Sequence, residues 1–203
     1  MAVPIVALET NGSDCFYESM ALNNGRFNSV KKNLPHGVNL VYNDQHSLYL
    51  AHFTEFSSKA SGSLGASEPS VGVVKMALER PGGVKTLSVP DELSIEALTS
   101  FASKSLATLI FNSDSTEDDH KFLVELACST TLVPGYHRSL FDKLVVRKAQ
   151  EESEERPVVV FIVCGGFKID LGMVAGYQSL VAENSGESWT VKNDDGQELS
   201  FEK

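Results

Sequence analysis

The stretch Pro157-Val158-Val159-Val160-Phe161-Ile162-Val163-Cys164-Gly165-Gly166 is the strongest indicator of the fold in this sequence. Its β-branched residues predict a strand buried on both faces, as found inside parallel α/β sheets. The glycines that follow allow a tight turn and a close approach of the backbone to another group. A thiol at the carboxyl end of such a strand stands where open α/β sheets bind ligands. The alternative, that Cys164 is simply a small buried apolar residue, stays open.

Strands and helices alternate along most of the chain. Strands are predicted at 3–8, 84–89, 106–111 and 158–163. Helices are predicted at 15–22, 69–78, from 90 onward, 122–132, from Pro134 to about 148, and 171–182. Residues 23–47 read as a long surface loop, 46–56 has partly helical spacing, and a weak hairpin is expected around Asp195-Gly196. The alternation predicts an α/β fold with an open, mainly parallel sheet and helices on both faces.

Composition and charge restrict the class of partner. The 203 residues are 42% hydrophobic and 22% charged, as in an ordinary soluble globular protein. A formal net charge of −10 argues against nucleic acid or an anionic membrane as the partner. The alternative, that the acidity only aids solubility, stays open. No apolar run approaches the roughly 20 residues of a membrane-spanning helix.

The cysteines and the amino-terminal residues indicate a reducing, cytoplasmic location. Cys15, Cys128 and Cys164 are widely spaced, which suits reduced thiols. Residues 1–6 lack the pattern of a signal peptide. No CxxC pair or HExxH motif occurs, so the sequence gives no support to a zinc site.

Four stretches occur in the order found in a known enzyme family. They are Val3-Pro4-Ile5-Val6-Ala7-Leu8-Glu9-Thr10, Ser58-Lys59-Ala60-Ser61-Gly62-Ser63-Leu64-Gly65-Ala66, Leu123-Val124-Glu125-Leu126-Ala127-Cys128 and Val163-Cys164-Gly165-Gly166. Together they resemble the pyridoxal-phosphate (PLP)-dependent L-serine/L-threonine dehydratases, or ammonia-lyases, of the tryptophan-synthase-β fold type, especially the fungal ones. The resemblance covers residues 3–182, corresponds to the carboxyl-terminal half of the family's catalytic chain, and leaves 183–203 as a polar tail.

The resemblance implies a cofactor contact at the carboxyl end of the strand at 158–163. In the family, the cysteine matching Cys164, followed by the glycine matching Gly165, lies beside the pyridine nitrogen of PLP. A neutral thiol there leaves the nitrogen largely unprotonated, which suits β-elimination.

The resemblance also implies a monovalent cation site. It assigns the carboxylate of Glu9 and the backbone carbonyls of Ser13, Leu64 and Ala66 as ligands, the oxygen set that hard cations prefer. Cys15 stands where the family often has serine, and sulfur is a poor ligand for such a cation. Two alternatives stay open: Glu9 caps a helix, and the small residues before Leu64 merely fill a crowded crossing.

Two catalytic elements of the family have no match in this sequence. The family anchors PLP on a lysine in a Ser-Phe-Lys-x-Arg-Gly context and holds its phosphate with a tetraglycine loop. Lys59 belongs instead to the stretch that resembles the cation site, and Gly82-Gly83 is expected to end a helix. We therefore predict no catalytic residue in this chain and no activity of the chain alone.

Two segments depart from the pattern of the family or of a packed domain. Residues 103–118 are expected to be an insertion, either a surface loop or translated intron; the second explanation, together with the abrupt start at Met1, would indicate an incomplete gene model. Residues 149–156 contain a run of glutamates and are expected to be a solvated linker.

Two functions follow. The first is that of an L-serine, or L-threonine, dehydratase-like protein, which in the complete enzyme converts serine to pyruvate and ammonia. The alternative is a non-catalytic binding or regulatory module, associating with itself or docking on a full-length homologue.

Overall fold

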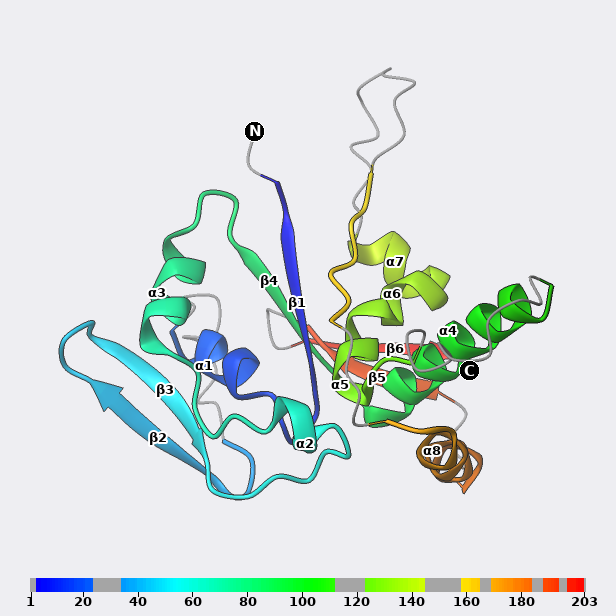
Figure 1. The fold of residues 1–203 in the computed structure, drawn as a ribbon. Coiled ribbons are helices and arrows are strands. Elements are labelled where there is room, and N and C mark those ends of the chain that lie inside the picture. The colour runs from blue at the N-terminus through cyan, green and yellow to red at the C-terminus, as the bar shows by residue number, and fades with distance from the viewer. Residues whose placement is uncertain are drawn as a thin grey trace, which may run out of the picture.

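The structure, a computed structural model, describes residues 3–23, 34–111, 123–144, 158–164, 169–183, 188–193 and 197–202. It is a mixed α/β fold in which a four-stranded sheet and a separate two-stranded hairpin are surrounded by helices (Figure 1). The strands are β1 (Ile5–Thr10), β2 (Val38–Asn43), β3 (Leu48–Phe53), β4 (Val84–Val89), β5 (Ser188–Lys192) and β6 (Glu198–Glu202). The helices are α1 (Cys15–Asn23), α2 (Ser61–Leu64), α3 (Val71–Glu79), α4 (Asp91–Phe111), α5 (Leu126–Ser129), α6 (Val133–Tyr136), α7 (Arg138–Leu144) and α8 (Leu171–Glu183).

The larger sheet has the strand order β1-β4-β5-β6. β1 and β4 are parallel, with Ile5 opposite Val84 and Glu9 opposite Ser88. β5 joins β4 in the antiparallel direction through the pair Ser88 and Lys192, and β5 and β6 form an antiparallel hairpin. The sheet is therefore mixed, whereas the sequence predicted a mainly parallel one, because one parallel pair is extended by a hairpin from the end of the chain.

The two faces of the β1–β4 pair carry different side chains. Alternate residues of a strand point to opposite faces, and the register places Val6, Leu8 and Leu87 on one face. The opposite face carries smaller or polar residues, including Glu9 and Ser88. We call these the apolar face and the polar face.

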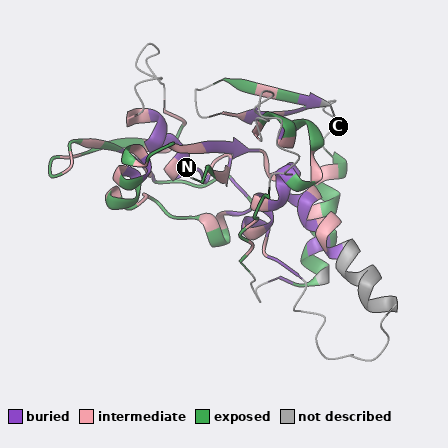
Figure 2. Ribbon diagram, turned by 90° about the horizontal axis from the view of Figure 1, so that it is seen from above, coloured by how far each residue is buried: buried purple, intermediate pink, exposed green. Residues whose placement is uncertain are grey.

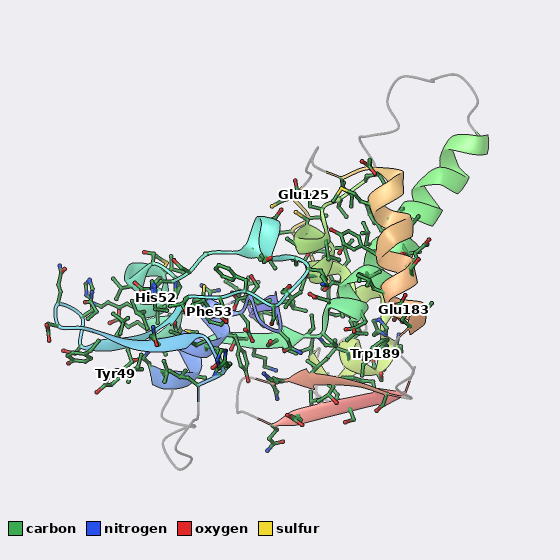
Figure 3. The ribbon with its side chains drawn as sticks, turned by 90° about the horizontal axis from the view of Figure 1, so that it is seen from below. Tyr49, His52, Phe53, Glu125, Glu183 and Trp189 are labelled. Carbon is green, nitrogen blue, oxygen red and sulfur yellow. The ribbon has the colours of Figure 1, made fainter. Side chains whose placement is uncertain are left out.

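The apolar face packs against helices α4, α6 and α7. Leu87, Leu93, Val133 and Leu140 are among the fully buried side chains of this cluster. Trp189 of β5 is also buried in it, and Figure 3 shows its side chain directed toward the helices. Residues 188–192 and 198–202 thus form the hairpin that the sequence predicted, and they contribute to the core although the segment was expected to be a polar tail.

Helices α1 and α3 and the β2–β3 hairpin form the other side of the molecule (Figure 1). Met20, Leu50 and Val74 form a small cluster there, and the outer surface of the hairpin is exposed (Figure 2). Asn39 pairs with His52 in this antiparallel hairpin. The expectation of a loop over 23–47 is wrong for 38–43, and the helical spacing over 46–56 is wrong for 48–53, because both segments pair as strands.

The sequence predictions at 158–163 and 106–111 are wrong. The described residues 158–164 run in an extended conformation without strand pairing. Phe161 packs toward the core, but Val158, Val160 and Ile162 are 88%, 78% and 76% exposed. Residues 106–111 are the last part of α4, so the expected loop character of 103–118 is also wrong for 103–111. The rest of 103–118 and all of 149–156 lie outside the described residues.

Other elements match the sequence predictions closely. α1, α3 and α8 occur where they were expected, and α4 begins at Asp91. Pro134 stands in the first turn of α6 and separates short helices instead of one long one. Among the described residues, no helix is long and apolar enough to cross a membrane.

Candidate functional site at the carboxyl edge of β1 and β4

The carboxyl ends of β1 and β4 meet at one edge of the sheet, where α/β folds commonly bind ligands. The loop 11–14 follows β1, and Asp91 at the start of α4 follows β4. The backbone N–H of Asn11 donates to the carbonyl of Val89 over 2.8 Å, which joins the two strand ends. A third segment, Ser57 to Ala60, crosses the same edge.

The loop after β1 requires a glycine. Gly12 has a φ of +81°, a conformation that side chains with a Cβ rarely adopt. A Cβ atom at this position would lie 2.0 Å from the hydroxyl of Ser57. The turn is closed by a bond from the Ser13 N–H to the Thr10 carbonyl (2.9 Å) and by one from the Gly12 N–H to the Asp14 carboxylate (3.1 Å).

Glu9 caps the amino end of α1. Its carboxyl oxygens accept hydrogen bonds from the backbone N–H groups of Phe16 (3.2 Å) and Tyr17 (2.6 Å). These N–H groups have no partner within the helix, so a carboxyl group there is stabilising. The capping role left open by the sequence is therefore present in the structure.

Burial raises the pKa of Glu9, the nearby Asp14 and Glu18 carboxylates add to the rise, and the two N–H groups lower it, so that the net pKa is about 8. The side chain is therefore mostly protonated at neutral pH. Burial, reinforced by Glu9 and Asp14, also raises the pKa of the Cys15 thiol to about 12. The polar face thus holds an acidic cluster, defined as Glu9, Asp14 and Glu18, in which Asp14 and Glu18 are buried and Glu9 is half-buried.

Ser88 connects this cluster to the centre of the sheet. Its hydroxyl lies 2.5 Å from an oxygen of Asp14 and 2.6 Å from the side-chain amide of Asn11. The neighbouring Ser13 is fully buried, and its hydroxyl has no hydrogen-bond partner among the described residues. The site is consequently polar, closely packed and short of cationic groups.

A second set of hydrogen bonds fixes the crossing segment to both strand ends. Thr10 and Ser58 contact through their hydroxyls at 2.7 Å, and Ser58 donates to Asp91 at 2.7 Å. The backbone N–H of Lys59 donates to the other oxygen of Asp91 at 2.6 Å. Burial raises the pKa of Asp91 although these bonds act in the opposite direction.

A hollow of about 280 Å³ opens beside this network. Asn11, Lys59 and Asp91 provide polar groups to its lining, and Ile95 and Leu180 provide apolar ones. Its volume and its mixed lining suit a small polar molecule.

The first three stretches that resemble the dehydratases contact one another in chain order. Thr10 of the first meets Ser58 of the second, and Ser63 of the second donates a hydrogen bond to Glu125 of the third, which Figure 3 shows close to α2. The third and fourth stretches are linked less directly, because Cys128 and Val163 pack against one apolar cluster. Just outside both stretches, the Thr131 hydroxyl lies 2.9 Å from the Cys128 carbonyl and 3.3 Å from the Ile162 carbonyl.

The predicted cation ligands have these local contacts. Glu9 and Ser13 are together at the amino end of α1. Leu64 packs against the cluster around Leu126, and its carbonyl accepts a hydrogen bond from the Ala66 N–H over 2.7 Å. The described part of the chain contains no group of three or more His, Cys, Asp or Glu residues arranged to hold a metal ion. The four-ligand cation site stays a prediction.

The predicted cofactor contacts are described in part. Cys164 is exposed at the end of the extended segment, and Gly165 lies outside the described residues. Cys164 does not line the hollow beside Lys59 and Asp91. The PLP contact stays a prediction, and no catalytic step is derived from it.

Sequence reasoning missed Ser58, Ser88 and Asp91 as site residues. Asp91 was interpreted as a favourable first-turn residue of a helix, Ser58 was quoted only as part of a stretch with no role assigned, and Ser88 carried no motif. The available signal was that polar residues follow two predicted parallel strands, whose carboxyl ends must share an edge.

No protein-family model, curated protein or solved structure matches this chain.

Proposed function

We propose that the chain is the carboxyl-terminal part of an L-serine/L-threonine dehydratase-like protein, a PLP-dependent ammonia-lyase of the tryptophan-synthase-β fold type. The observation that carries the proposal is that the first three stretches contact one another through Thr10–Ser58 and Ser63–Glu125. Cys128 of the third and Val163 of the fourth also pack against one apolar cluster, so segments far apart in the sequence gather in the fold. The parallel β1–β4 pair, with polar loops at its carboxyl edge, also supports a ligand site there.

Within this proposal, Cys164 holds the ring nitrogen of PLP, which supplies the electron sink for elimination of a β-hydroxyl group when bound. The hollow beside Lys59 and Asp91 suits the polar ends of a small amino acid. The anchoring lysine and the phosphate loop come from sequence that this chain does not match, so the chain alone is inactive. The three free cysteines support a reducing compartment, such as the cytoplasm.

A monovalent cation is proposed as the counter-charge of the acidic cluster. Three carboxyl groups crowd the polar face, and burial raises the pKa of Glu9. A potassium or sodium ion beside Glu9 and Ser13 would favour the ionised form. Potassium chloride should therefore raise the melting temperature at pH 8 more than tetramethylammonium chloride at the same ionic strength. Equal melting temperatures in the two salts would contradict the cation site.

The decisive experiment compares the 203-residue chain with a fusion. The fusion places the amino-terminal half of an L-serine dehydratase, with its lysine and tetraglycine loop, ahead of Val3. We expect no pyruvate from L-serine with the chain alone, and pyruvate release with the fusion. Cys164→Ser in the fusion should lower kcat at least tenfold, whereas the matched Cys128→Ser control should retain it. A folded fusion that binds PLP and releases no pyruvate or 2-oxobutyrate would overturn the proposal.

Association with a second chain is a further candidate function, favoured by the exposed apolar side chains of the extended segment. Val158 and Val160 are 88% and 78% exposed, and Val3 at the edge strand is 74% exposed. Apolar surface of this kind supports self-association or docking on a full-length homologue. Sedimentation velocity of the chain tests self-association, and Val158→Ser with Val160→Ser should shift any dimer toward monomer.

A further inference from the structure

We propose that Cys128 and Cys164 form a reversible disulfide when the protein meets a peroxide, which makes this pair a modification site. The third cysteine, Cys15, belongs to a different part of the molecule, where it is buried beneath α1.

Thr131 brings the two cysteine-bearing segments together. Its single hydroxyl oxygen is within hydrogen-bond distance of the carbonyls of Cys128 and Ile162. Cys164 is two residues beyond Ile162 in an extended segment, and Cys128 begins the last turn before Thr131. Phe161 holds the same segment down by packing on Gly135, where an added Cβ would lie 3.4 Å from the ring. The extended segment is therefore held at Ile162 by Thr131 and at Phe161 by Gly135 of α6.

The side-chain environments of Cys128 and Cys164 also indicate that the two residues lie close together. Cys128 and Val163, the residue before Cys164, pack against one apolar cluster. The Cys128 pKa is raised, chiefly by burial and then by the charge of the Cys164 thiolate and of Glu125. This influence of Cys164 on Cys128 agrees with the approach of the two segments at Thr131. A disulfide needs Cα atoms about 4.4–6.8 Å apart, and an extended segment held on a helix can adjust to this.

The exposure of the two thiols assigns their order of reaction. Cys164 is exposed, so its thiolate can attack one oxygen of hydrogen peroxide; the O–O bond breaks, and a sulfenic acid and hydroxide form. The partly buried Cys128 then attacks the Cys164 sulfur, the S–O bond breaks and water leaves. Two thiols and one peroxide thereby give one disulfide and two waters.

The functional consequence rests on the proposed dehydratase function. A disulfide would remove the Cys164 thiol from the ring nitrogen of PLP and couple peroxide exposure to loss of that contact. The pairing itself does not depend on PLP, so its test needs no activity.

The test treats the folded 203-residue chain with a small excess of hydrogen peroxide at pH 7.5. Thiol counting and peptide mass spectrometry without reductant follow. We expect the loss of two of the three thiols, a cross-linked peptide pair containing Cys128 and Cys164, and full recovery with dithiothreitol. Cys15→Ala is the matched control and should give the same cross-link.

The single variants distinguish a true pair from independent oxidation. With Cys128→Ser, Cys164 should proceed to sulfinic acid, because its resolving partner is gone. With Cys164→Ser, Cys128 should stay reduced over the same time. The proposal is overturned if the unsubstituted chain yields sulfinic Cys164 with Cys128 still reduced, or if the cross-links join two chains. Failure here leaves the dehydratase proposal intact, since the fusion experiment does not use an oxidant.

Discussion

The two faces of the β1–β4 pair are built from the same strands but differ in what they bury. The apolar face buries Leu87 and Leu8 against α4 to α7, so its stability follows from area removed from water. The polar face buries Glu9 and Ser88 beneath α1, where capping bonds compete with the cost of burying acidic groups. Helices cover both faces. The apolar face contributes stability, whereas the polar face holds carboxyl groups whose burial costs free energy. The predictions below test that difference.

The largest expected effect is the pH dependence caused by Glu9. Its folded pKa of about 8 exceeds the ordinary value of 4.5, so the folded state binds the proton more tightly than the unfolded state. The stabilisation is complete below about pH 4.5 and is lost as the pH rises through 8, several kcal/mol in all and at most about 5 kcal/mol. Urea unfolding of Glu9→Gln should show a much flatter profile than the unsubstituted chain between pH 5 and 8.

Glu79→Gln is the matched control, because Glu79 is exposed and makes a 3.9 Å surface pair with Lys75. It should leave the pH profile unchanged, since such pairs contribute little. If the free energy of unfolding depended on pH equally in Glu9→Gln and in the unsubstituted chain, Glu9 would not have a raised pKa.

Leu87→Ala tests the apolar face. Leu87 is fully buried, so the substitution should lower the free energy of unfolding by about 3 kcal/mol through lost burial and a residual cavity. Leu40→Ala on β2 is the control, because Leu40 is 52% exposed and should cost well under about 1 kcal/mol. Urea denaturation at pH 5, where Glu9 is protonated, measures both. A similar cost for the two variants would show that β4 is not in the core.

Asp91→Ala tests the hydrogen bonds that join the strand ends. The substitution removes the acceptor of the Ser58 hydroxyl and of the Lys59 N–H, and should destabilise the protein by about 1–2 kcal/mol. Asp142→Ala, in an exposed pair with Arg138, should cost less than about 1 kcal/mol. Thermal unfolding at pH 7 checks the ranking, and the reverse order would exclude a stabilising role for Asp91.

The smallest effect is expected from Tyr17→Phe. The Tyr17 hydroxyl donates to the Asn193 carbonyl over 2.9 Å and links α1 to the β5–β6 hairpin. Its loss should cost about 1 kcal/mol, against almost none for Tyr42→Phe, whose side chain is 48% exposed. Chemical denaturation resolves this difference, and indistinguishable midpoints would show that the link does not contribute to stability.

The sequence predicted the elements whose signals are local. β1 and β4 are apolar runs bounded by turns, α1 follows an Asn-Gly-Ser-Asp turn, and the 188–202 hairpin has Asp-Gly between its strands. These patterns depend on residues adjacent in the sequence, so tertiary packing does not change the elements that they predict.

The wrong predictions concern which strands pair with one another, which a single sequence does not specify. Residues 158–163 have stronger β-branched character than β1, yet they pack Phe161 on a helix and form no strand ladder with other described residues. β propensity favours an extended backbone, but a ladder requires a free edge in register. Conversely, residues 38–43 and 48–53 alternate weakly and still pair, because each supplies the other's edge.

The candidate site was predictable only in part. The sequence placed the ligand edge after 158–163, which forms no strand ladder with other described residues, whereas the observed hollow lies at the ends of β1 and β4. Glu9 was singled out with its capping role open. The raised pKa of Glu9 comes chiefly from its burial once α1 is folded over the sheet, and then from the nearby Asp14 and Glu18. That burial arises from tertiary packing, so no spacing in the sequence encodes it.

The strand order has a consequence for the timing of folding. β4 pairs with β1 from the beginning of the chain and with β5 from near its end, and Ser88 faces Lys192 in the single register pair of the second contact. Both pairings close long loops, which are slow to form, whereas the β2–β3 and β5–β6 hairpins close short ones. We therefore expect the hairpins to gain amide protection first in pulsed hydrogen exchange, and the β4 amides to gain it last.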